Sequence, residues 1–480
     1  MATAGPEFAG LKQPQLPLLT RLSRGAILYT LLALTKPLMW YMEWSSTRPT
    51  SPHRPTMVKT YECRPTLPIR IFFPAQNDRS TAQALPTLFM IHGGGFTVGS
   101  ADNDDEWNTG FARMHDVLVI ELNYRKGPYH SFPTATYDLE ALLLAAVDDE
   151  SLPIDRARVA VGGFSAGGNL TLSVCQLDSV RDRVKPSAAL PLYPVGDFTV
   201  PLAAKVKTRH YKPGLGSGLR STGKDFLSTM SPYFNWAYVP VGQDLRDPLL
   251  SPYFAPREAL PPHLFLLGIE LDQLAHEAWR MASKLAGRPV PALEDKVGQE
   301  KPAAEGGNPL ILDDERFAFS HVEEGGQRSV RWLLVPDQVH GFDHLPPSIH
   351  GSEEAMKDAQ VKTAAYQKLL EKLLVIRGAE ESSQRGKSLS PSTTQPKDLG
   401  SPGPAGNWVP PRASVRAWVS SGDSESPAIS DDLKSLIHRG GGVAPHAARN
   451  EALDGDQEAE RPRGSCALCS CPPPQPSPES

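Results

Sequence analysis

The stretch RVAVGGFSAGG, residues 158–168, decides the fold class of this chain. Its first half is a short valine-rich run, typical of a strand that is buried on both faces of a parallel sheet. The small residues that follow let the backbone turn sharply into a helix, so that Ser165 is exposed above the end of the strand. Gly-x-Ser-x-Gly in this strand–turn–helix context predicts a nucleophilic serine at position 165.

Six further runs of the same character lie on either side of this stretch, at residues 69–73, 87–91, 117–121, 188–193, 263–268 and 330–335. Stretches with helical spacing lie between or after them, at 136–149, 167–178, 274–287 and 353–374. Strands that alternate with helices predict a three-layer α/β fold, with a mostly parallel central sheet flanked by helices. In such a sheet, functional residues gather at the carboxyl ends of the strands.

A serine hydroxyl is a poor nucleophile at neutral pH and needs a base. His340 lies in the loop after the last predicted strand, and Asp272 lies just past the preceding strand. The chain order Ser, Asp, His is the order that this sheet topology requires. Asp337 and Glu277 are competing acids. We favour Asp272 because the acid must approach the imidazole Nδ1 from the side opposite the serine, which a neighbouring loop permits.

Three consecutive glycines occur within MIHGGGFTVGS, at residues 90–100. Glycine loses more backbone freedom on folding than any other residue, so three in a row at a strand end need a reason. The tetrahedral intermediate of acyl transfer carries an oxyanion that needs backbone N–H donors about 3 Å away. We expect Ala166, the residue after the serine, to supply one donor, and the bare backbone of Gly93 and Gly94 to supply the others.

Five motifs in this order resemble those of the hormone-sensitive-lipase group of α/β hydrolases, the arylacetamide-deacetylase-like esterases. They are His92–Gly95, Gly163–Gly168, DPLLSP at 247–252, the block around Asp272, and HGF at 340–342. The resemblance covers residues 57–376 and implies an α/β-hydrolase fold with a helical cap, and cleavage of carboxylic esters through an acyl-enzyme. It assigns the triad to Ser165, Asp272 and His340 and the oxyanion donors to Gly93, Gly94 and Ala166, with His92 supporting the glycine loop.

The resemblance leaves the leaving group and the second nucleophile open. An amidase, a lactamase or an acyltransferase would use the same triad, and a hydrolase-fold ligand-binding protein without catalysis is a further alternative. None of these readings requires a cofactor or a metal. The chain departs from the family at KGPYHSFP (126–133), at His276, and in a long insertion at about 290–328, and these departures bear on substrate preference.

The chain divides into three parts by composition. Residues 1–56 form an apolar segment that contributes to the cap, 57–377 form the catalytic domain with a cap insertion at about 197–240, and 378–480 form a tail. The tail is rich in Pro, Gly, Ser and charge, so we expect it to be disordered, with Cys466, Cys469 and Cys471 as incidental thiols. Four aromatic residues of the insertion are candidates for lining the substrate pocket: Phe226, Tyr233, Phe234 and Trp236.

Composition also limits the partners. The net charge of −5 excludes a basic stripe of the kind that binds nucleic acid, so we expect a small-molecule ester or lipid substrate. The apolar run in residues 26–42 is too short and interrupted for a comfortable membrane span. It is expected to lie at a membrane surface, to pack over the catalytic domain, or to act as a signal-anchor. The sequence leaves open whether the protein is cytoplasmic or associated with the endoplasmic-reticulum membrane.

Overall fold

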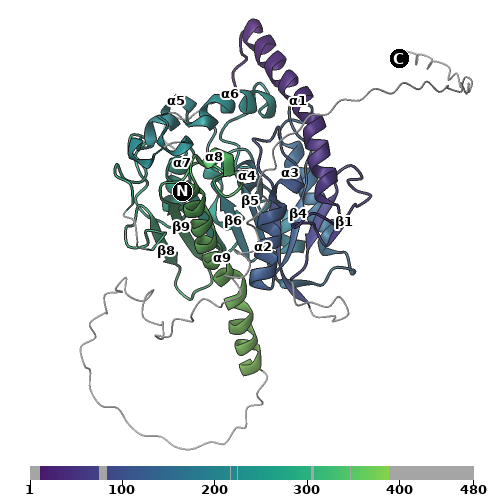
Figure 1. Cartoon of the computed structure of the whole chain (residues 1–480). Helices are drawn as coiled ribbons and strands as arrows, with labels where there is room; N and C mark the ends of the chain where they lie inside the picture. The colour runs from purple at the N-terminus through teal and green to yellow at the C-terminus, as the bar shows by residue number, and fades with distance from the viewer. Residues whose placement is uncertain are drawn as a thin grey trace, which may run out of the picture. The chain divides into compact units, whose positions relative to one another are not determined.

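A mostly parallel β-sheet forms the centre of the protein (Figure 1). The computed structural model describes residues 11–74, 84–216, 218–223, 225–303, 308–345 and 347–388. In this part of the chain, nine strands are arranged in the order β1-β2-β4-β3-β5-β6-β7-β9-β8. The six from β4 to β9 pair in parallel, and antiparallel strands extend both edges. The strands are β1 (Met57–Lys59), β2 (Ile69–Phe72), β3 (Leu85–Ile91), β4 (Leu118–Leu122), β5 (Ile154–Phe164), β6 (Ala188–Leu192), β7 (His263–Ile269), β8 (Ala318–Val322) and β9 (Ser329–Val335).

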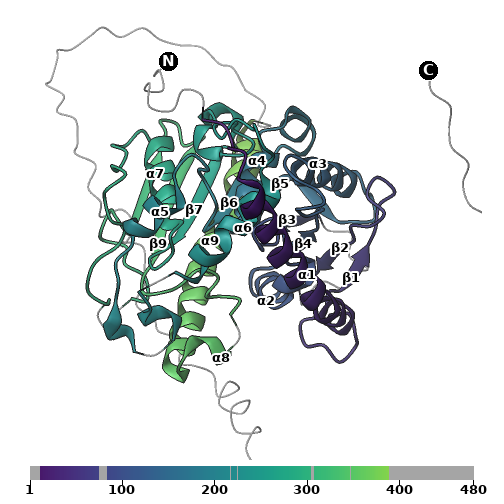
Figure 2. The same ribbon diagram turned by 90° about the horizontal axis from the view of Figure 1, so that it is seen from above.

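Helices cover both faces of this sheet (Figure 2). One face packs against α2 (Asp105–His115) and α9 (Glu353–Ser388), and the other against α3 (Thr134–Val147), α4 (Ala166–Val174) and α7 (Ala275–Leu285). Successive side chains of a strand point to opposite faces, and β3 follows this rule. Leu88 and Met90 pack toward α2 and α9, whereas Phe89 and Ile91 pack toward α3 and α4. This architecture confirms the predicted three-layer α/β fold.

The insertion between β6 and β7 carries two helices, α5 (Leu202–Lys205) and α6 (Phe226–Tyr238), joined by short 3-10 turns (Figure 1). Helix α6 begins after Asp225, whose Oδ1 accepts a hydrogen bond from the Leu227 N–H at 2.8 Å. A side-chain oxygen at this position satisfies one of the N–H groups that a helix start leaves without a partner. The insertion corresponds to the segment at 197–240 that the sequence analysis assigns to a cap.

The N-terminal apolar segment forms α1 (Leu18–Ser46), which packs on the domain along one side only. Leu28 is fully buried, Gly25 lies against the Trp236 ring of α6, and Ser46 accepts a hydrogen bond from Arg70 at 2.9 Å. Among the helices that the structure describes, none combines the length and the apolar character needed to cross a bilayer. Of the three roles expected for this segment, α1 therefore has the contacts of a helix packed over the domain.

Several elements differ from the prediction. All seven predicted strands are present, but β1, β8 and α2 were not predicted. Strand β8 lies at the sheet edge with mostly exposed side chains. Helix α2 mixes buried apolar residues such as Trp107 and Phe111 with buried polar ones such as Asn108, which obscures its apolar pattern in the sequence. Helix α9 continues to Ser388, so residues 378–388 are helical where the sequence predicts the start of a disordered tail. Residues 389–480, including the three tail cysteines, lie outside the described residues.

The distribution of the core predicts how the chain responds to truncation. The buried apolar residues of the described part lie between Leu28 and Leu370. We expect a protein that ends at Ser388 to melt within about 2 °C of the full chain, a difference of roughly 1 kcal/mol or less. Differential scanning calorimetry measures this. A chain that ends at residue 352 is the control, because it loses α9 and its buried Tyr366 and Leu370 and should melt at a much lower temperature. A large loss of stability in the longer protein would contradict the expectation.

Candidate active site

Ser165 lies at the sharp turn between β5 and α4, at the carboxyl end of the central strand. Its backbone has φ 55° and ψ −112°, a conformation that residues with a Cβ rarely adopt. Such strain persists only where the surrounding structure enforces it. Here the Ser165 N–H donates to Leu192 O at 2.9 Å, and the Ser165 carbonyl accepts from Asn169 N at 3.1 Å as α4 begins. The sequence predicts a sharp strand-to-helix turn here with Ser165 exposed; the turn is present, but Ser165 is buried.

The structure brings Ser165, His340 and Asp272 into one hydrogen-bonded chain. The Ser165 Oγ lies 2.8 Å from His340 Nε2, and His340 Nδ1 lies 2.7 Å from Asp272 Oδ2. The second oxygen of Asp272 accepts a hydrogen bond from the Leu274 N–H at 2.9 Å, which orients the carboxylate. The three residues come from the ends of β5, β9 and β7, respectively, and all three are buried.

The two competing acids are bonded elsewhere. Asp337 pairs with Lys212 at 2.7 Å and accepts a hydrogen bond from the Ala303 N–H at 2.8 Å. Glu277, on α7, pairs with Lys205 and accepts from the Gly196 N–H at 2.8 Å. Asp272 is therefore the carboxylate that lies against the imidazole of His340.

The surroundings of His340 favour its protonated form. Burial lowers the pKa of His340, but the negative charge and hydrogen bond of Asp272, together with Asp225 and Asp343, outweigh burial and raise the pKa above its usual value. Because its pKa is raised, the neutral imidazole of His340 accepts a proton from a hydroxyl more readily. Asp272 then stabilises the positive charge of the imidazolium that forms. The arrangement is thus suited to removing the proton of the Ser165 hydroxyl.

The glycine loop after β3 lies beside Ser165. Gly94 has φ 107°, and a Cβ there would collide with Val98 O, so this position requires glycine. The Gly93 carbonyl lies 2.7 Å from His92 Nδ1, and the Gly94 carbonyl accepts from Thr97 N and Val98 N at 3.0 and 2.9 Å. Neighbouring residues of the protein therefore fix the carbonyl groups of both glycines.

His92 supports this loop from below. Its ring stacks on Tyr124 at 4.4 Å, and its Nε2 lies 3.2 Å from Asn123 Oδ1. Burial, together with the charge of Lys126, lowers the pKa of His92 to about 3. A neutral imidazole has one N–H, and its shorter contact, from Nδ1 to the Gly93 carbonyl, holds the loop backbone. The family resemblance implies this supporting role.

The aromatic residues of α6 occupy different places. Phe234 lies against the glycine loop, so closely that a Cβ on Gly95 would overlap its ring. Trp236 instead packs against α1 at Gly25, and Tyr233 is half-buried on α6. The Phe226 side chain lies outside the described residues. Of the four pocket candidates, Phe234 is the one whose described contacts place it at the site.

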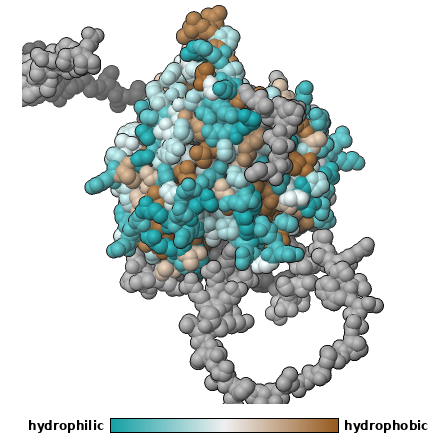
Figure 3. Space-filling model, turned by 180° about the vertical axis from the view of Figure 1, so that it is seen from behind, coloured by the Kyte–Doolittle hydropathy of each residue, from teal (hydrophilic) through white to brown (hydrophobic). Residues whose placement is uncertain are grey.

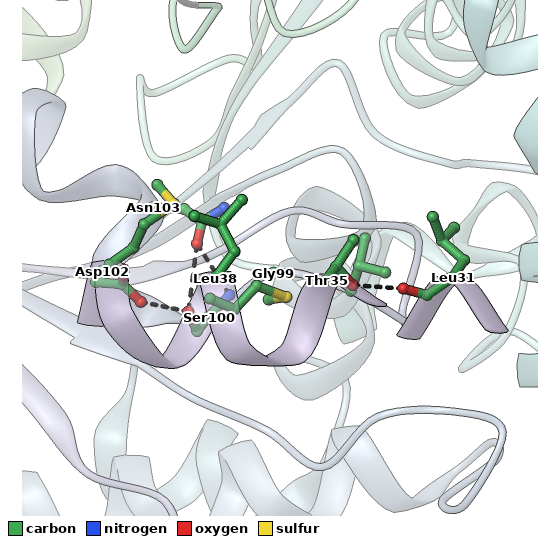
Figure 4. A pocket seen from close by; sticks show the side chains of 10 residues that line it. Leu31, Thr35, Leu38, Gly99, Ser100, Asp102 and Asn103 are labelled. Atoms are coloured by element: carbon green, nitrogen blue, oxygen red, sulfur yellow. Dashed lines mark hydrogen bonds between the residues drawn. The ribbon is translucent and has the colours of Figure 1, made fainter. Parts of the chain in front are cut away.

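Two cavities lie along α1. One, of about 310 Å³, is formed by α1 residues and the segment that follows the glycine loop (Figure 4). It is lined by Leu31, Thr35, Leu38, Met39, Met42, Val98, Gly99, Ser100, Asp102 and Asn103. The polar side chains in this lining bond within the protein, Thr35 to Leu31 O and Ser100 to its neighbours Asp102 and Asn103 (Figure 4). A second cavity of about 280 Å³ includes Trp236 and Tyr29 in its wall. Apolar space thus adjoins α1 on the described surface.

Sequence reasoning missed a set of buried charges around the Asp272 loop. Arg209, Lys212 and Asp225 of the insertion and Glu270 at the start of the loop are all buried. No motif marks them, because a buried lysine and a surface lysine read identically in a sequence. Only the pairing of Lys212 with the buried Glu270 and Asp337 distinguishes it.

Comparisons with known proteins agree with this geometry. A family model described as "alpha/beta hydrolase fold" matches residues 88–297. The ethyl acetate hydrolase of Pseudomonas putida is 33% identical over 294 residues, which cover 61% of this chain and 76% of that protein. The arylesterase of Saccharolobus solfataricus is 32% identical over 235 residues, covering 48% of this chain and 70% of that protein. The arylacetamide deacetylase of Bos taurus is 33% identical over 270 residues, covering 52% and 60%. The chain therefore belongs to the α/β-hydrolase family, in the group that resembles hormone-sensitive lipase and arylacetamide deacetylase.

Proposed function

We propose that this protein is a serine carboxylic ester hydrolase that works through an acyl-enzyme on Ser165. The observation that carries the proposal is the chain of short hydrogen bonds from Ser165 Oγ through His340 to Asp272, at the carboxyl ends of three parallel strands. The ethyl acetate hydrolase and the arylesterase support the proposal, because the match with this chain covers more than two thirds of the length of each.

The first half-reaction forms the acyl-enzyme. The Ser165 Oγ attacks the ester carbonyl carbon while its proton passes to His340 Nε2, and Asp272 stabilises the imidazolium that forms. The carbonyl oxygen becomes an oxyanion and accepts hydrogen bonds from the Ala166, Gly93 and Gly94 N–H groups. Ala166 is the first residue of α4, where an N–H has no partner within its helix. His340 then donates its proton to the leaving alcohol as the ester C–O bond breaks.

The second half-reaction regenerates the enzyme. Water takes the place of the alcohol, and His340 removes its proton as it attacks the acyl carbon. The Ser165–acyl bond breaks, the proton returns to Ser165 Oγ, and the carboxylic acid leaves. Backbone donors held in place before the reaction stabilise the developing charge at no reorganisation cost, and this is usually a large part of such catalysis.

The substrate is a small-molecule ester. The names of two relatives specify ethyl acetate and aryl esters as substrates, and the name of a third specifies an arylacetamide. The same triad would also cleave an activated amide, so aryl amides and lactones belong in the screen. The apolar ring of Phe234 beside the glycine loop favours substrates with an apolar acyl or alcohol part.

We further infer that α1 rests on a membrane surface. Its outward side exposes large apolar residues, among them Leu19 at 81%, Leu34 at 74% and Trp40 at 65%. Figure 3 shows brown, apolar side chains at the projecting tip where Figure 1 places one end of α1. An apolar helix surface with Trp and basic residues such as Arg21 is typical of helices that lie in the interface of a bilayer. Such a position would bring apolar esters to the protein from the lipid phase.

Replacement of Ser165 by Ala tests the nucleophile. We expect Ser165→Ala to abolish turnover of p-nitrophenyl acetate and butyrate and to abolish covalent labelling by a fluorophosphonate, with an unchanged melting temperature. Ser173→Ala, in the same helix region but hydrogen-bonded to Leu249 O, is the matched control and should retain labelling. Labelling that persists in Ser165→Ala would contradict the assignment of Ser165 as the nucleophile.

The pH profile tests the base. His340 acts only when neutral, and its pKa is raised above the usual value of about 6.5, so kcat/KM should fall as the pH drops through a value above about 6.5. The Asp272→Asn variant removes the charge that raises this pKa, so its acid limb should move to lower pH. Initial rates of ester hydrolysis between pH 5 and 9 measure both. A parent profile that stays flat down to about pH 5, with chemistry limiting, would rule out His340 as the base.

Vesicle binding tests the α1 surface. The double variant Leu19→Glu, Leu22→Glu places two charges on the exposed side of α1 and should reduce co-sedimentation with phosphatidylcholine–phosphatidylserine vesicles at least severalfold, while soluble esters are hydrolysed as before. Met114→Glu on α2, at a residue of comparable exposure (59%), is the control and should bind as the parent does. Equal binding by all three proteins would leave α1 without this role.

A further inference from the structure

The insertion between β6 and β7 forms hydrogen bonds and an ion pair with the loop that carries Asp272. This loop, residues 270–274, is called the acid loop below. The insertion bonds the residues on both sides of Asp272: Lys212 pairs with Glu270, Arg209 donates to Leu271 O, and Asp225 accepts from Gln273 N. The acid of the triad is therefore held through its neighbours by a segment that is separate from β7 and α7, the two elements that its own loop connects.

Lys212 joins the acid loop to the loop of His340. Its Nζ lies 2.7 Å from Glu270 Oε2 and 2.7 Å from Asp337 Oδ1, and its side chain is completely buried. The Asp337 N–H donates to the same Glu270 carboxylate at 2.8 Å. Glu270 and Asp337 precede Asp272 and His340 by two and three residues, respectively. One buried cation thus ties together the starts of both catalytic loops.

Arg209 and Asp225 hold the rest of the acid loop. The Arg209 guanidinium donates to Leu271 O at 2.9 Å and to Thr222 O, within the insertion, at 2.6 Å. Asp225 Oδ2 accepts from Gln273 N at 2.7 Å while its Oδ1 caps α6. The Gln273 side chain donates to Ser231 Oγ on α6 at 2.8 Å. Every bond in this set crosses from the insertion to the acid loop or anchors a residue that does.

The contacts between the insertion and the acid loop depend on the charges of three buried residues, Lys212, Glu270 and Asp337. Glu270 and Asp337 are two buried carboxylates that share one lysine, and without it they would repel each other across the loops. Burial raises the pKa of Glu270, and Lys212 opposes this effect. The Lys212 ammonium offsets this repulsion, and backbone N–H groups of Gln299 and Asp337 also donate to Glu270.

We propose that Lys212, assisted by Arg209 and Asp225, is a positioning residue that sets the distance between Asp272 and His340. The inference rests on the proposed function of the triad. The same insertion also places Phe234 against the glycine loop, so one element contacts both that loop and the acid loop. According to this proposal, Asp272 stays within hydrogen-bond distance of His340 only while the insertion keeps its contacts with the acid loop.

Two matched lysine variants test the proposal. Lys212→Met should lower kcat for p-nitrophenyl butyrate on the order of 10²-fold with little change in KM, since an acid displaced by about 1 Å costs this much. Lys205→Met is the control: Lys205 is also a buried lysine of the insertion, paired with the buried Glu277, but Glu277 lies on α7 outside the acid loop. Lys212→Met removes the cation of two buried carboxylates and Lys205→Met that of one, so both should lose stability, but only Lys212→Met should lose turnover.

The pH profile separates positioning from a long-range effect of charge. Asp272, Asp225 and Asp343 are the charged groups that act on His340 and raise its pKa. Loss of the lysine charge alone would raise this pKa further, whereas displacement of Asp272 lowers it. We expect the acid limb of kcat/KM to move to lower pH in Lys212→Met and to stay in place in Lys205→Met. A shift to higher pH would overturn the proposal.

A double-mutant cycle provides the decisive comparison. If Lys212 acts through Asp272, then Lys212→Met should reduce kcat less than about threefold further when Asp272 is already Asn. Full additivity of the two losses would refute the proposal. Should Lys212→Met fail to fold, Arg209→Gln tests the same prediction, because it loses the Leu271 contact without leaving a carboxylate unpaired.

The rate at which a fluorophosphonate labels Ser165 gives a second readout that needs no ester substrate. A parent protein that is labelled slowly and hydrolyses no ester would refute the proposed function. A parent that is active, with Lys212→Met equally active and equally fast in labelling, would refute the positioning role alone.

Discussion

Ser165 has a left-handed backbone conformation, φ 55° and ψ −112°, that the neighbouring chain must enforce. The enforcement comes from the sheet: β5 is central, pairs on both sides in parallel, and delivers the Ser165 N–H to Leu192 O of the adjacent strand. The turn then starts α4 at Ala166, which leaves the first N–H groups of that helix next to the serine. One strained turn thus places the Ser165 side chain against His340 and leaves the first N–H groups of α4 beside it, as the proposed acyl transfer requires. The glycine loop and the two other catalytic loops have to be built around this point.

Burial of His340 and Asp272 has an electrostatic consequence. His340 and Asp272 are enclosed, so their interaction is poorly screened and the pKa of His340 rises although burial alone would lower it. His92, equally buried but without a carboxylate partner, has its pKa lowered to about 3. The two buried histidines differ in their neighbours, and this difference raises the pKa of one and lowers that of the other. The same low screening makes the Lys212 contacts effective at the start of both loops.

The insertion between β6 and β7 serves more than one purpose. Its α6 carries Phe234 against the glycine loop and packs Trp236 against α1, while its polar residues bond the acid loop. The N-terminal helix, the insertion and the acid loop therefore form one connected set of contacts above the strand ends.

The sequence by itself determined the parts of this protein that depend on local pattern. Seven strands, four helices and the positions of Ser165, Asp272 and His340 at strand ends follow from apolar runs, small residues at one turn and the order of motifs. The sequence left three candidate acids, and only the tertiary structure decided among them, because it pairs Asp337 with Lys212 and Glu277 with Lys205. The edge strand β8 escaped prediction because its side chains are mostly exposed, and α2 because polar residues interrupt its buried apolar ones. The buried charges of the insertion escaped it for a different reason. Lys212 meets Asp337 across 125 residues of chain, and whether a lysine is exposed or fully buried is set by what folds over it, which no local pattern records.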